Sequence, residues 1–263
     1  MTTRDEPWPA GTPAWVELTV PDRRRAMEFY GGLLGWSFEE GPPETGYYTQ
    51  SFVDGRVVVG LSEPMPGQPP SPAAWLTYLA VDAVDTVVER VRDAGGAVLM
   101  EPMDVMDFGR MAIAADPTGA VFGLWQSGTH TGFGIANEPG SVTWNEVLTR
   151  DVDAAQAFYR AVFGYGFGDM SGEGFRYATL DIDGRPCGGV GSLAAGTPDE
   201  VPAHWQTYFM VDDADDASTR VTELGGRVTG GPQDSPYGRM VFAAGPFGEP
   251  FALMGPVPAA AQG

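Results

Sequence analysis

Two short motifs place a carboxylate beside an indole, and they are the residues of this sequence best suited to chemistry. Glu17 follows Trp15 by two residues, and Glu146 follows Trp144 by two residues. Residues two apart on a strand share one face, so each glutamate would lie next to an aromatic ring. Burial between indoles favours the neutral form of a carboxyl group, which suits a general acid or base. A carboxylate beside an aromatic face could also hold a cation.

Few other side chains are candidates for catalysis. The chain has two histidines, His130 and His204, one cysteine, Cys187, and no lysine. Without lysine there is no amine for a Schiff base or for anchoring pyridoxal phosphate. A single cysteine forms neither an intrachain disulfide nor a thiolate metal cluster, and no histidine accompanies Cys187 to activate its thiol. His130 falls in a glycine-rich stretch, where we expect it to be exposed.

Composition narrows the class of protein further. The 263 residues are 43% hydrophobic and carry a formal net charge of −20, which disfavours binding to a phosphate backbone. The sequence shows no long apolar run and no signal-peptide pattern at its N-terminus. We therefore expect a cytoplasmic protein with no nucleic-acid or membrane partner.

The two motifs belong to a long internal repeat. An offset of 129 residues carries Trp15-Val16-Glu17-Leu18 to Trp144-Asn145-Glu146-Val147, and the helix end FYGGLLGW at 29–36 to FYRAVFGY at 158–165. Such colinear agreement predicts two copies of one domain, at 13–127 and 142–257. A linker at 128–141 would join them, with a flexible N-terminus at 1–12 and a C-terminal tail at 258–263.

Each copy divides again into two units of one strand, one helix and three strands. In the first unit a strand runs to Val20, Asp22 begins a helix that Gly35 ends, and Asp54-Gly55 joins two further strands. The order recurs from Trp75. Strands outnumber helices, so the fold class is α+β, built of four βαβββ modules.

This pattern resembles the vicinal oxygen chelate superfamily of glyoxalases, bleomycin-resistance proteins and dioxygenases. The resemblance rests on the FY…GW helix end and on the turn Asp116-Pro117-Thr118-Gly119 before a last strand, and it covers 13–257. It is strongest to tandem two-domain actinobacterial proteins described as glyoxalase-like or hydroxylase-like. It implies that paired modules form one domain around a cleft, where metal-dependent members hold a metal ion.

The same resemblance implies where metal ligands would lie. The first-strand position, seven residues before the Asp that opens each helix, is Trp15, Trp75, Trp144 or Trp205. The last-strand position is Gly123 in the first copy and Ala252 in the second. An indole N–H has no lone pair for a cation, so we predict no metal, no cofactor, and neither glyoxalase I nor extradiol dioxygenase activity.

If those positions point inward, the clefts are aromatic. Glu17 and Glu146 are then the candidate acid/base residues, and the candidate ligand-binding residues are Trp15, Trp75, Thr77, Trp144, Trp205, Thr207 and Phe209. Such a pocket suits a small organic molecule, aromatic or cationic. Arg56, Arg110, Arg185 or Arg239 could instead pair with the glutamates and make them structural.

Three functions follow from this pattern. The first is metal-independent binding of a small organic molecule, such as sequestration of an antibiotic or metabolite. The second is a cofactor-independent isomerase, lyase, cyclase or epoxide-opening hydrolase that uses Glu17 or Glu146. The third is a scaffold whose clefts are filled by its own side chains. In each case the duplication predicts a monomer that is a pseudo-dimer, or a homodimer.

Overall fold

The computed structural model describes residues 2–64 and 72–257. The four helices and the strands follow one another in the order that the repeat predicts. Their bounds are β1 Thr2–Thr3, β2 Pro13–Thr19, α1 Arg23–Leu34, β3 Ser37–Glu40, a 3-10 turn Pro43–Thr45, β4 Thr49–Val53, β5 Arg56–Ser62, β6 Ala74–Ala80, α2 Val84–Asp93, β7 Ala97–Val105, β8 Gly109–Ala115, β9 Val121–Ser127, β10 Ile135–Ala136, β11 Val142–Thr149, α3 Val152–Phe163, β12 Gly166–Asp169, β13 Tyr177–Ile182, β14 Arg185–Ser192, β15 His204–Met210, α4 Ala214–Glu223, β16 Arg227–Ser235, β17 Gly238–Ala244 and β18 Pro250–Gly255.

Two eight-stranded sheets form the framework, one from each half of the chain. The first has the order β3-β4-β5-β2-β6-β9-β8-β7, and the second has the equivalent order β12-β13-β14-β11-β15-β18-β17-β16. In each sheet two modules meet where their first strands pair antiparallel, β2 with β6 and β11 with β15. The α+β fold class and the four βαβββ modules are therefore confirmed.

Helix α1 shows why the repeated FY…G stretch forms a helix end. The Asp22 carboxylate accepts a hydrogen bond from the Arg25 backbone N–H, which caps the first turn. Phe29 and Tyr30 lie on the buried face, and Gly35 ends the helix with a φ of 73°, a left-handed conformation that favours glycine. The copy α3 repeats this with Asp151 and Gly164.

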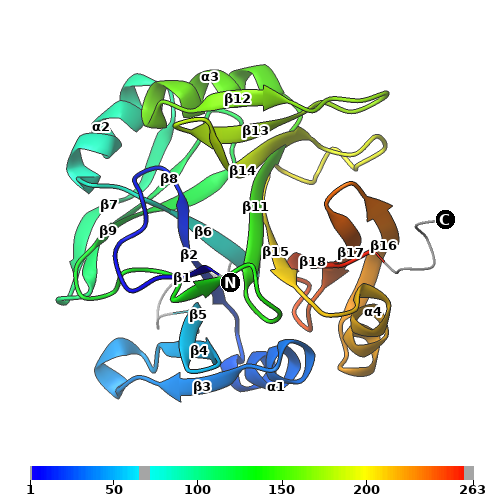
Figure 1. Ribbon diagram of the computed structural model, residues 1–263. Helices are drawn as coiled ribbons and strands as arrows, with labels where there is room; N and C mark the ends of the chain where they lie inside the picture. The colour runs from blue at the N-terminus through cyan, green and yellow to red at the C-terminus, as the bar shows by residue number, and fades with distance from the viewer. Residues whose placement is uncertain (1, 65–71, 258–263) are drawn as a thin grey trace.

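The helices of the two domains lie side by side in two pairs, which join the domains (Figure 1). Helix α1 of the first domain lies beside α4 of the second, and α2 lies beside α3. The buried side chains accordingly form two clusters, and each cluster draws on both domains. One joins Phe29 of α1 to Phe251 of β18, and the other joins Phe122 of β9 to Phe158 of α3.

The segments that precede each domain's first strand cross over to the other domain. Tyr165 of the second domain donates its hydroxyl to the Gly11 carbonyl, and Trp36 of the first donates its indole N–H to the Gly140 carbonyl at 2.6 Å. Gly11 and Gly140, in the segments 2–12 and 128–141, therefore each contact the opposite domain. Strands β1 and β10 within them pair with each other.

No helix in the described ranges is long and apolar enough to cross a bilayer.

Candidate functional site

The tryptophans at the four family positions do not share one face of the sheets. Trp15 pairs with Tyr78, and Glu17 pairs with Leu76, so those four side chains share the face that carries no helix. Trp75 points to the opposite face. The second domain repeats this arrangement, because Trp144 pairs with Tyr208 and Glu146 with Gln206, whereas Trp205 points to the helices.

The prediction that each cleft holds two indoles is therefore wrong for Trp75 and Trp205. Counting back from Asp82 and Asp212 assumed that these residues cap the helices. The caps are Ala83 and Asp213, one residue later. A shift of one residue along a strand moves the side chain to the other face. The equivalents of Trp15 and Trp144 are consequently Leu76 and Gln206.

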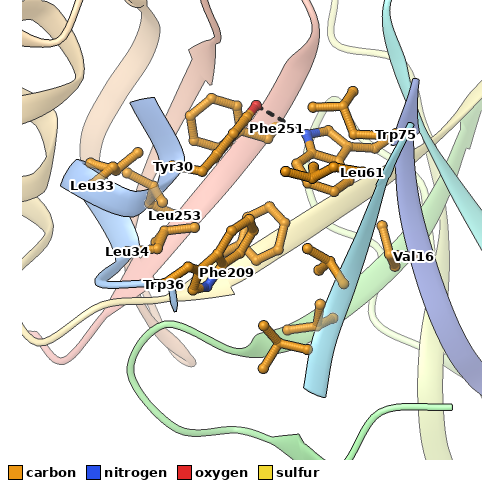
Figure 2. Packing of buried hydrophobic residues seen from close by; sticks show 14 of the residues in the cluster. Val16, Tyr30, Leu33, Leu34, Trp36, Leu61, Trp75, Phe209, Phe251 and Leu253 are labelled. Atoms are coloured by element: carbon orange, nitrogen blue, oxygen red, sulfur yellow. Dashed lines mark hydrogen bonds between the residues drawn. The ribbon is translucent and has the colours of Figure 1, made fainter. Parts of the chain in front are cut away.

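Trp75 and Phe209 lie in the core between the domains (Figure 2). The indole N–H of Trp75 donates to the Tyr30 hydroxyl at 3.3 Å, and Tyr30 donates to the Glu249 carboxylate at 3.0 Å. Trp205 makes the matching bond to Tyr159 at 2.9 Å. These indoles, predicted to bind a ligand, hold the two domains together.

The carboxylates next to Tyr30 and Tyr159 come from different positions of the repeat. Asp116 of the first domain lies near Tyr159, and its charge contributes to a raised pKa of that phenol, after the larger effect of burial. The offset of 129 carries Asp116 to Gly245, and the second domain supplies Glu249 instead. A Cβ on Gly245 would lie 2.0 Å from the Glu249 carboxylate, so the glycine leaves room for it.

Thr77 and Thr207 also lie between the domains rather than in a ligand site. Both side chains are fully buried, and each donates its hydroxyl to the Oδ1 atom of Asn145 at 3.0 Å. Asn145 is itself 3% exposed. One amide oxygen therefore joins a strand of the first domain to two strands of the second.

Each helix-free face carries a quartet of two tyrosines, one glutamate and one tryptophan. In the second domain the Trp144 indole donates to the Tyr177 hydroxyl at 2.9 Å, and Tyr177 donates to Glu146 Oε2 at 2.8 Å. Tyr208 donates to Glu146 Oε1 at 2.6 Å. Both oxygens of the carboxylate thus accept a phenol hydrogen.

The first domain repeats the quartet with longer bonds. Trp15 donates to the Tyr48 hydroxyl at 3.0 Å, Tyr48 donates to Glu17 at 3.3 Å, and Tyr78 donates to Glu17 at 2.7 Å. Tyrosines, and not the arginines that the sequence allowed, are therefore the partners of Glu17 and Glu146. Arg56, Arg110 and Arg239 pair instead with aspartates at the surface.

Burial dominates the electrostatics of both quartets. It raises the pKa of the Glu17 and Glu146 carboxyls, and the phenol hydrogen bonds oppose this shift only in part. Burial and the neighbouring carboxylate raise the pKa of the phenols of Tyr48, Tyr78, Tyr177 and Tyr208. At neutral pH the phenols therefore stay protonated and remain hydrogen-bond donors.

The residues at the metal positions implied by the resemblance do not fit a metal ion. Gly123 pairs with Tyr78 on the helix-free face, and a Cβ at Gly123 would lie 2.1 Å from the phenol ring. On the end strands of the first modules, a Cβ on Gly60 would lie 1.8 Å from the Tyr48 hydroxyl, and one on Gly189 would lie 2.0 Å from that of Tyr177. Tyrosines thus fill the space. Within 2–64 and 72–257 no three His, Cys, Asp or Glu side chains are grouped to hold a metal.

The quartet of the first domain is covered by the segment 128–141. His130 packs edge-on to Trp15, with ring centroids 4.4 Å apart, and also contacts Trp125. Burial lowers the pKa of His130 from 6.5 to about 4, and its Nε2 atom has no hydrogen-bond partner. The expected exposed position for His130 is therefore wrong. Phe133 completes the cover, and Trp15 is left only 3% exposed.

The second domain has a groove at the corresponding tryptophan. The groove has a volume of about 570 Å³ and lies where residues 4–13, residues 133–145 and the hairpin of β13 and β14 meet. Three aromatic rings line it: Trp8, Phe133 and Trp144. Trp8 is fixed by an indole hydrogen bond to the Phe133 carbonyl at 3.0 Å. Trp144 thus connects this groove to the buried Glu146.

Two further candidate residues from the sequence, His204 and Cys187, lie in the second domain. His204 pairs with Leu148, two residues along from Glu146, so it shares the helix-free face. Cys187 lines the groove, but burial raises the pKa of its thiol to about 12, which makes it unreactive. The groove itself left no signal in the sequence, since it forms between segments far apart in the chain.

The chain resembles known proteins over nearly its whole length. It is 40% identical over 253 residues to the protein named "Putative glyoxylase CFP32" of Mycobacterium tuberculosis, covering 94% of this chain and 96% of that one. It is 38% identical over 269 residues to the anthracycline biosynthesis protein DauV of Streptomyces sp. strain C5, covering 96% and 97%.

Solved structures show the same fold at low identity. The Mn(II)-bound glyoxalase from Novosphingobium aromaticivorans superposes with a TM-score of 0.65 at 16% identity, covering 95% of this chain and 84% of that one. The model of the Glyoxalase/Bleomycin resistance protein/Dioxygenase superfamily matches residues 12–124 and again 132–253. The chain is therefore a tandem member of the glyoxalase/bleomycin resistance protein/dioxygenase superfamily.

Proposed function

We propose that this protein binds a small planar aromatic molecule in the groove beside Trp144. The observation that carries the proposal is the groove itself, whose volume of about 570 Å³ lies in the range of pockets for small organic ligands, roughly 300–1,000 Å³. Its walls offer three aromatic rings for stacking. The rings of Trp8 and Trp144 are held by hydrogen bonds, so little ordering accompanies binding.

The names of two relatives support an aromatic ligand. Proteins of two Streptomyces strains, 38% and 37% identical to this chain, are named for the biosynthesis of anthracyclines, which are polycyclic aromatic compounds. A flat ring system of this kind suits a groove lined by Trp8, Phe133 and Trp144. The ligand would be stored, carried or presented to another enzyme.

We propose that binding is confined to the second domain and needs no metal. The two domains carry the same quartet, but Trp15 lies beneath His130 and Phe133 whereas Trp144 lines the groove. At the last-strand metal positions, Gly123 pairs with Tyr78 and Ala252 pairs with Tyr208. Dialysis against EDTA should therefore leave the affinity unchanged, and a loss of binding restored by one divalent metal would refute metal independence.

Tryptophan fluorescence provides the main test. A planar probe such as an anthraquinone should quench the emission of the wild-type protein, and Trp144→Phe should remove most of that quenching and weaken binding. Trp15→Phe is the matched control, because the same substitution in the covered copy should leave the affinity unchanged. Equal effects of the two substitutions, with both variants folded, would contradict the assignment to this groove.

A second candidate function is acid/base catalysis by Glu146. Its carboxyl is buried, its pKa is raised, and both its oxygens accept phenol hydrogens. Tyr177 accepts from the Trp144 indole and donates to Glu146, so a substrate would exchange a proton with the phenol or the carboxyl directly and not through the indole. Glu146→Gln should abolish turnover of such a substrate, while Glu17→Gln in the covered copy should retain it. Full activity in Glu146→Gln would refute this role.

A further inference from the structure

We infer that the groove selects an aromatic molecule that carries an anionic group, and that Arg185 binds this group. The inference rests on the proposed function, because it names the charge of the molecule bound at the same site. It starts from a contrast between two arginines that the repeat makes equivalent. Arg56 and Arg185 both follow an Asp-Gly turn, 129 residues apart.

The arginine of the first domain is occupied. Arg56 donates to the Asp5 carboxylate at 2.7 Å and to the Gly134 carbonyl at 3.4 Å. Asp5 lies in the N-terminal segment, and Gly134 lies in the segment that covers the first domain. The guanidinium of Arg56 therefore has a structural task, and a ligand would have to displace it.

The arginine of the second domain has no such task. Arg185 lies at the edge of the groove on β14 and is exposed. Within the described part of the chain, no carboxylate or carbonyl accepts a hydrogen bond from the guanidinium of Arg185. Its guanidinium presents a planar set of donors suited to a carboxylate, sulfonate or phenolate.

The charges around the groove favour an anion over a cation. Arg4 and Arg185 line it together with a single acidic residue, Asp183. Arg4 lies 5.5 Å from the centroid of the Trp8 ring and donates to the Pro7 carbonyl, which fixes it as part of the wall. In a chain with a formal net charge of −20, this is a local excess of positive charge. The carboxylate that would attract a cation, Glu146, is already bonded to two phenols.

The geometry also gives the ligand an orientation. The aromatic rings line the part of the groove formed by residues 4–13 and 133–145, and Arg185 belongs to the β13–β14 hairpin. A planar ring system would stack among the aromatic side chains and point its acidic substituent at the hairpin. Neutral analogues would keep the stacking and lose the ionic contact.

Two probes of the same shape test the inference. Anthraquinone-2-carboxylate and anthraquinone-2-carboxamide have the same shape and differ in charge and in the amide N–H donors, and their affinities are measured by tryptophan quenching at low salt. The wild-type protein should bind the carboxylate about three- to fivefold more tightly, the effect of one ionic contact made by an exposed arginine. Arg185→Gln should reduce this preference to about onefold without changing the affinity for the carboxamide, and Arg185→Lys should keep part of it.

Arg90→Gln, on the exposed face of α2, is the control for a change in net charge and should keep the wild-type preference. Equal binding of both probes by the wild-type protein, or a preference that survives in Arg185→Gln, would overturn the role of Arg185 while leaving the groove as the site. Failure of both probes to bind would refute the proposed function and this inference with it. Loss of the preference in Arg90→Gln would show that it reflects overall charge.

Discussion

Replacing Asn145 by valine should destabilise the junction between the domains. Asn145 Oδ1 accepts hydrogen bonds from Thr77 of the first domain and Thr207 of the second, both fully buried. The substitution is mild in shape, and the repeat already places a valine, Val16, at the equivalent position of the first domain. The perturbation therefore removes one acceptor from two buried donors.

The magnitude follows from the number of groups left without a partner. A buried hydroxyl without a hydrogen bond costs about 1–3 kcal/mol, and two hydroxyls are affected. Release of the buried amide offsets part of this loss, so we expect a destabilisation of about 2–4 kcal/mol. The triple variant Thr77→Val/Asn145→Val/Thr207→Val removes donors and acceptor together, and it should return to within about 1 kcal/mol of wild type.

Urea unfolding at pH 7, followed by tryptophan fluorescence and circular dichroism, measures these differences. Ligand binding is measured in parallel on Thr77→Val/Thr207→Val, which should leave it unchanged because neither threonine lines the groove, whereas Asn145 does. A single variant that loses less than about 0.5 kcal/mol would refute the reasoning, since such a loss is typical of a surface position. A triple variant no more stable than the single one would refute it as well.

Three further predictions concern other residues. His130 has a folded pKa of about 4 against an ordinary 6.5, so stability should be complete above pH 6.5 and fall by up to about 3 kcal/mol as pH drops towards 4. The variant His130→Phe should lack this pH-dependent loss of stability when it is unfolded in urea at several pH values. A variant with the same pH profile as wild type would contradict the role of His130. Glu249→Ala should lower the melting temperature, because it leaves the buried Tyr30 hydroxyl without an acceptor. Adding Gly245→Asp should recover part of this loss, because it places an aspartate at the position equivalent to Asp116 of the first domain. Gly123→Ala should destabilise by about 1–3 kcal/mol or more, because the new Cβ would lie 2.1 Å from the Tyr78 ring, and a neutral effect would mean that this ring moves freely.

The repeat in the sequence was sufficient to predict the fold. Matching residues at a constant offset predicted two copies, and the strand and helix patterns within each copy predicted four βαβββ modules. Helix ends were readable because Asp22 and Gly35 perform local tasks that depend on few neighbours. Local rules of this kind do not need the rest of the structure.

The strand face of the candidate residues was predicted correctly only where strand register could be counted from a correct cap. Counting back from Asp22 and Asp151 placed Trp15 and Trp144 with their glutamates, as the structure has them. The same count from Asp82 and Asp212 failed, because an extra residue separates strand from helix in the second and fourth modules. One residue of error exchanges the two faces of a strand, so Trp75 and Trp205 were assigned to the wrong side.

The sequence by itself determined the duplication, the α+β modules, and a carboxylate beside an indole in each copy. The tertiary structure alone decided that tyrosines donate to these carboxylates, that residues 128–141 cover the first copy, and that a groove opens at the second. The physical reason is that repeats, caps and alternation act between residues close in sequence, whereas hydrogen bonds such as that of Tyr208 to Glu146 join residues 62 positions apart. Two nearly identical motifs, Trp15-x-Glu17 and Trp144-x-Glu146, therefore differ in access only because different segments of the chain pack upon them.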